Sequence, residues 1–67
     1  MEKRSLTLAG HRTSVALEPE FWQALEQIGA QRNQALSTLI LEIDEQREAT
    51  NLASAIRVYI LQQMGGA

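Results

Sequence analysis

Residues 10–22, GHRTSVALEPEFW, decide the fold of this chain because a short strand there leads directly into a helix. Residues 12–17 alternate between two sets of side chains, which is the period of a β-strand. One set is predicted to face a core: Thr13, Val15 and Leu17. The other set is predicted to face outward: Arg12, Ser14 and Ala16. Because Pro19 is typical of the first turn of a helix, the stretch predicts a strand over 12–17 and a helix that begins near residue 19.

The predicted strand has no obvious partner in the chain. A lone strand of this length is not stable in water. Residues 1–11 precede it and are predicted to form a basic N-terminal arm. Within the arm Leu6 and Leu8 alternate with Ser5 and Thr7, which is also compatible with a short strand, but Ala9-Gly10 interrupts the pattern. We therefore expect the partner strand to come from a second copy of the chain.

The first predicted helix covers residues 19 to about 32. Phe21, Leu25 and Ile28 are spaced by four and three residues, which places them on one face of a helix. Trp22 lies beside that face and is expected to cover the edge of the core. This helix is thus expected to pack mainly through Phe21, Leu25 and Ile28.

Two further helices are predicted over about 37–46 and 51–64, followed by a tail at 65–67. Ser37 is a suitable N-cap for the second helix, and Thr50-Asn51 are suitable caps for the third. The apolar arc of the third helix is too wide for one small core, so we expect this helix to be buried on two sides. No internal repeat is evident. The predicted fold is mostly α with one β-strand.

The size and composition of the chain indicate association. A chain of 67 residues without cysteine cannot use disulfides, and small domains are marginal alone. A two-fold homodimer would pair the predicted strand with its own copy in an antiparallel ribbon. A two-stranded ribbon has the width of the DNA major groove. We therefore expect an intertwined homodimer that exposes Arg12, Ser14 and Ala16 from each chain.

The charge is unevenly distributed, although the chain as a whole carries a formal net charge of −2. Residues 1–17 hold three basic side chains and one acidic one, whereas residues 18–67 hold three arginines against seven acidic residues. Lys3, Arg4 and His11 are expected to contact DNA phosphates, which raises affinity without specifying sequence. The basic first quarter of the chain is the predicted DNA side.

The segments KRSLTLAGHRTSVALEPEFW, LEIDEQ and NLASAIRVYIL together resemble the ribbon-helix-helix family of DNA-binding proteins. The resemblance covers nearly the whole chain. It implies a homodimer whose ribbon reads base edges through Arg12, Ser14 and Ala16. It also implies a phosphate contact by the start of the second helix, near Ser37 and Thr38. The resemblance further implies that pairs of dimers bind adjacent half-sites on DNA.

Three features depart from the family pattern. Ala16 stands where a polar reader is usual and offers only an apolar contact, for instance to a thymine methyl group. The chain is acidic overall, and its third helix goes beyond the minimal fold. These departures leave open a dimer that has lost DNA binding.

The expected function is that of a bacterial or phage transcriptional regulator, a cytoplasmic repressor that binds double-stranded operator DNA. The alternative is a protein-interaction module, an antitoxin or adaptor dimer that holds a partner through its third helix. Neither a catalytic set nor a metal cluster is evident, so we expect no enzyme activity, no cofactor and no metal. No secretory signal and no membrane span are expected.

Overall fold

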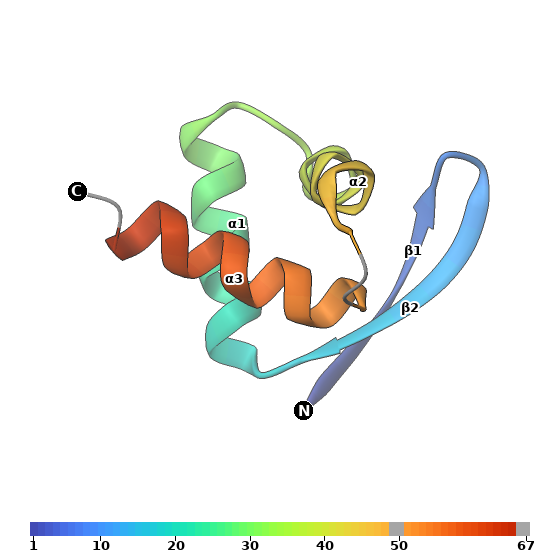
Figure 1. Cartoon of the computed structure of the whole chain (residues 1–67), viewed down its shortest axis with the longest axis horizontal. Helices are drawn as coiled ribbons and strands as arrows, with labels where there is room; N and C mark the ends of the chain where they lie inside the picture. The colour runs from blue at the N-terminus through green and yellow to red at the C-terminus, as the bar shows by residue number, and fades with distance from the viewer. Residues whose placement is uncertain (49–50, 66–67) are drawn as a thin grey trace.

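The computed structural model describes residues 1–48 and 51–65, which form a β-hairpin and three α-helices. The hairpin stands along one side of the helices, and α3 crosses in front of α1 (Figure 1). The bounds of the elements are β1 Glu2–Leu8, β2 His11–Leu17, α1 Pro19–Gln31, α2 Leu36–Gln46 and α3 Leu52–Gly65. Three helices were predicted, over about 19–32, 37–46 and 51–64. A tail was predicted at residues 65–67. Gly65 instead belongs to α3, and residues 66–67 lie outside the described residues.

The prediction of a single strand is wrong, because β1 occupies most of the segment expected to be an arm. β1 pairs with β2 in an antiparallel register that runs from Glu2 opposite Leu17 to Leu8 opposite His11. The partner strand therefore comes from the same chain. β2 therefore does not need a strand from a second copy to form a two-stranded ribbon.

The turn between the strands consists of Ala9 and Gly10, both with positive φ. Their φ angles of 52° and 82° match the primed turns that suit the twist of a two-residue hairpin. Glycine adopts such angles freely, whereas alanine pays for its Cβ there. The Ala9-Gly10 pair thus joins the strands rather than interrupting them.

Replacing Ala9 with asparagine is expected to stabilise the protein by about 0.5–1 kcal/mol, since Asn-Gly is the preferred pair for this turn and asparagine tolerates positive φ. The free energy of unfolding from urea titration measures the gain. Gly10→Ala is the matched opposite change and should destabilise the protein. A destabilising Ala9→Asn would contradict the positive φ at this position.

The core joins the inner face of the hairpin to all three helices. Its buried side chains are Leu8, Val15, Leu17, Trp22, Leu25, Ile28, Leu39, Ile40, Ile43, Ile56 and Ile60. Trp22 is fully buried, whereas Phe21 is only partly buried. The expectation that Phe21 leads the packing face and Trp22 covers its edge is therefore wrong. Trp22 turns inward because β1 lies over it, and its indole Nε1 donates a hydrogen bond to the carbonyl oxygen of Glu2 at 2.8 Å.

The N-cap predicted for the second helix is wrong, whereas one of the two caps predicted for the third helix is confirmed. The N-cap of α2 is Ala35 rather than Ser37, which lies inside the first turn. No side chain caps α2. At α3 the Asn51 Oδ1 accepts a hydrogen bond from the backbone N–H of Ser54 at 2.8 Å, so Asn51 caps this helix as predicted. Thr50, the other predicted cap, lies outside the described residues.

The third helix is buried on one side only in the single chain. Ile56 and Ile60 enter the core, and α3 packs against α1, α2 and β2. Val58, Leu61 and Met64 are 52%, 66% and 68% exposed. The expectation of burial on two sides therefore fails for this chain by itself.

Candidate nucleic-acid interface

The outer face of the hairpin carries the residues that the sequence assigns to base contact. Arg12, Ser14 and Ala16 alternate with the inward residues of β2, and Arg12 and Ser14 are exposed while Ala16 is partly exposed. Their placement follows from the period of two along the strand. The structure thus brings these three side chains together on one surface, as the alternation predicts.

β1 adds a second row to this surface. Its exposed residues are Lys3, Ser5 and Thr7. The register sets them opposite the β2 row, with Lys3 across from Ala16, Ser5 across from Ser14 and Thr7 across from Arg12. We call these six residues the ribbon face. Ser5 and Thr7 were not predicted as site residues, although their alternation with Leu6 and Leu8 was a signal for them.

The ribbon face has a positive charge at each end and no carboxylate. Arg12 lies near the turn, and Lys3 lies near the open end of the hairpin. The one acidic residue of β1, Glu2, is on the inner-facing row and bonds to Arg4. A two-stranded ribbon that exposes cations, hydroxyls and methyl groups offers the donors and the apolar contacts that major-groove edges accept.

Arg4, predicted to contact phosphate, is engaged within the protein. Its guanidinium donates to Glu2 Oε2 at 2.6 Å and to Glu26 Oε2 at 2.9 Å. It also lies 4.6 Å from the centroid of the Trp22 ring, within range of a cation–π contact. The hydrogen bonds to Glu26 and Glu2 raise the pKa of Arg4 above its ordinary value. Arg4 thus fastens β1 to α1 from the inner row, and its contact with phosphate stays a prediction.

The other predicted phosphate contacts lie at three places on the surface. Lys3 belongs to the ribbon face, and His11 is exposed where β2 leaves the turn. Ser37 and Thr38 are exposed in the first turn of α2, whose amides no side chain caps. The positive end of a helix dipole with free amides is suited to an anion.

An ion pair fixes the junction where the ribbon meets α1. Arg57 of α3 donates through Nη2 and Nε to Glu18 Oε1, at 2.9 and 3.1 Å, and its guanidinium lies 5.7 Å from the Phe21 ring centroid. A hydrogen bond from its own backbone N–H, followed by that from Arg57, lowers the pKa of the Glu18 carboxyl. Arg57 therefore links α3 to the base of β2.

In residues 1–48 and 51–65 no group of three or more histidine, cysteine or acidic side chains could hold a metal ion. None of the helices in these two ranges is long and apolar enough to cross a membrane.

Comparison with known proteins identifies the domain. Searches of curated proteins and of solved structures give no significant match. The family model described as a ribbon-helix-helix domain matches residues 1–64, nearly the whole chain. Proteins with this domain generally bind DNA as transcription regulators, typically as dimers, and they are typically not enzymes. With the hairpin, the helices and this match agreeing, the chain belongs to the ribbon-helix-helix family.

Proposed function

We propose that this protein is a sequence-specific DNA-binding transcriptional regulator, a repressor that inserts its β-ribbon into the major groove. The observation that carries the proposal is the ribbon face, which exposes Arg12 and Ser14 beside Lys3 and has no carboxylate. The acidic residues of the chain lie elsewhere, mainly on the helices and the loop after α2. Such a separation steers the polyanion toward the ribbon and away from the helices.

Each residue of the proposed interface has a chemical role. Arg12 forms a bidentate pair with guanine, Ser14 donates to or accepts from a base edge, and Ala16 contacts a thymine methyl group. The remaining contacts go to phosphates and set orientation rather than sequence. The proposed phosphate contacts are Lys3, Arg4, His11, Ser37 and Thr38.

The proposed working form is a homodimer in the bacterial cytoplasm, with pairs of dimers on adjacent half-sites. Dimeric binding is typical of the family. A dimer places two ribbons on one duplex, and linked sites raise the overall affinity without new contacts. In this proposal every copy contributes the hairpin of its own chain.

Selection from a random duplex-DNA library tests the function. The wild-type protein should enrich a short motif, and Arg12→Ala should lose or relax one or more of its positions, with a loss of about 1–3 kcal/mol for one guanine contact. Arg12→Lys is the matched control, because it keeps the charge and loses the bidentate fork. It should keep non-specific affinity and lose discrimination. If the wild-type protein enriches nothing even at low salt, the proposal is wrong.

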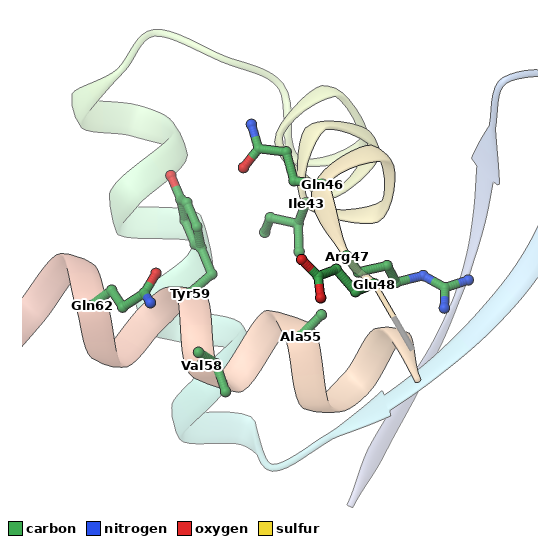
Figure 2. A pocket seen from close by; sticks show the side chains of 8 residues that line it. All are labelled: Ile43, Gln46, Arg47, Glu48, Ala55, Val58, Tyr59 and Gln62. Carbon is green, nitrogen blue, oxygen red and sulfur yellow. The ribbon is translucent and has the colours of Figure 1, made fainter. Parts of the chain in front are cut away.

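A second candidate function rests on the exposed side of α3. A groove of ≈ 410 Å³ lies between α2 and α3. Figure 2 shows the side chains that line it, namely Ile43, Gln46, Arg47, Glu48, Ala55, Val58, Tyr59 and Gln62. Beyond it Leu61 and Met64 are exposed on the same helix. An apolar helix face of this kind favours an antitoxin or adaptor that holds a protein partner, and a failed DNA selection would direct attention to it.

A further inference from the structure

The two strands of the hairpin carry nearly the same pattern. β1 contributes KRSLTL over residues 3–8, and β2 contributes RTSVAL over residues 12–17. Aligned nine residues apart, both segments begin with a basic residue, place serine third and end with leucine. The inner matches are expected in any hairpin with one buried face. The outer matches, Lys3 with Arg12 and Ser5 with Ser14, are not required by the core.

The observed register turns this sequence match into a spatial one. Ser5 lies opposite Ser14. A two-fold axis between them, perpendicular to the ribbon, relates two antiparallel strands and carries each residue of β1 onto the residue nine positions later. Lys3 then falls on Arg12, and Thr7 falls on Ala16. The hairpin is therefore a pseudo-two-fold ribbon built by one chain.

We infer that β1 is a second reading strand, so that one copy of the chain presents a complete base-reading ribbon in which Lys3, Ser5 and Thr7 act with Arg12, Ser14 and Ala16. The inference rests on the proposed DNA-binding function and adds to it which residues specify the site. Facing side chains on paired strands lie close enough to contact neighbouring base pairs together. Ser5 and Thr7 thus supply base contacts, and Lys3 supplies a base contact in place of the phosphate contact proposed above.

The packing of β1 favours a fixed reading strand over a mobile arm. The indole N–H of Trp22 donates a hydrogen bond to the Glu2 carbonyl, and the Arg4 guanidinium donates hydrogen bonds to the carboxylates of Glu2 and Glu26. Leu8 is buried at the other end of the strand. With the inner row fastened at both ends, the outer row keeps its register against β2. Side chains held on a rigid element are those that can read bases with precision.

The pseudo-symmetry is imperfect, and the differences predict the form of the DNA site. One end of the ribbon pairs Arg12 with Thr7, and the other pairs Lys3 with Ala16. Arginine binds guanine through a planar fork, whereas lysine acts as a point charge. The half-site that one hairpin reads should therefore be an imperfect palindrome, strongly specified at the Arg12 end and weakly at the Lys3 end. A ribbon made from two copies of β2 would instead read a perfect palindrome.

Selections with designed variants test this inference. Each half-site of the wild-type motif should be asymmetric, and the double variant Lys3→Arg, Thr7→Ala should shift the half-site toward a perfect palindrome because it makes the two outer rows alike. Ser5→Ala and Thr7→Val should each lower affinity for the wild-type motif by about 2- to 12-fold, the loss expected for one hydrogen bond. Gln23→Ala, an exposed change on α1, is the control and should leave the motif unchanged.

The outcomes separate the two proposals. A wild-type half-site that is itself a perfect palindrome, depends on Arg12 and is indifferent to Lys3, Ser5 and Thr7 would overturn the second reading strand and leave DNA binding intact. A folded wild-type protein that enriches no motif would overturn both. Circular dichroism of every variant verifies that the hairpin variants are folded before the motifs are compared.

Discussion

Replacing Trp22 with alanine is expected to lower the free energy of unfolding by about 3–5 kcal/mol, the usual loss for a large aromatic side chain in a core. Trp22 is fully buried, it donates to the Glu2 carbonyl, and the Arg4 guanidinium lies over its ring. One truncation therefore removes core volume and releases β1 from α1. Because the single core of a chain this small rarely supplies more than about 3–5 kcal/mol of stability, a large part of this variant should be unfolded at 37 °C.

The measurement is urea unfolding followed by circular dichroism, since Trp22 is the only tryptophan and its fluorescence is lost with it. Phe21→Ala is the matched control, a neighbouring aromatic residue that is only partly buried, and should cost clearly less. Trp22→Phe keeps a buried aromatic ring but removes the indole N–H, so it tests the hydrogen bond to Glu2 with a smaller loss of core volume. Equal losses for Phe21→Ala and Trp22→Ala would contradict the inward turn of Trp22.

Replacing Ile56 with alanine is expected to cost about 2–5 kcal/mol. Ile56 is fully buried on α3, the helix beyond the minimal fold, and α3 packs against α1, α2 and β2. The loss would show that the third helix closes the core of each chain and is not an appendage.

Val58→Ala provides the control on the same helix, because Val58 is 52% exposed and its truncation should change stability by less than about 0.5 kcal/mol. Both unfolding midpoints are measured at several protein concentrations. If Val58→Ala costs as much as Ile56→Ala and the midpoint rises with concentration, the exposed side of α3 is covered by a second subunit.

The helices are the part of the fold that local sequence specifies well. Apolar residues at spacings of three and four define the inner side of each helix, and Pro19 and Asn51 mark two of the starts. Neighbours along the chain decide these features, so they can be predicted without knowing what lies across the core. The prediction that Phe21 would be more buried than Trp22 was wrong. Both adjacent aromatic residues fitted the apolar spacing of the helix, and only the contact of Trp22 with β1 distinguishes them.

The second strand shows the limit of local patterns. The inner row of β1 begins with Glu2 and Arg4, so its alternation does not look apolar. Those two charges are tolerated on the inner row because Arg4 pairs with Glu2 and Glu26 and covers the Trp22 ring. The alanine of the turn also lacks the usual signal for a tight hairpin. Contacts between residues some twenty positions apart were needed to reveal the strand.

The sequence by itself determined the three helices and the outward placement of Arg12, Ser14 and Ala16, because period and spacing are properties of neighbouring residues. The family was indicated by the resemblance of its sequence segments. Only the tertiary structure decided that β1 pairs with β2, that Ser5 and Thr7 join the same surface, and that α3 leaves Val58, Leu61 and Met64 exposed. The physical reason is that strand pairing and burial depend on which distant segments meet. Their free energies are set by packing across the core and are not encoded in any short stretch of the chain.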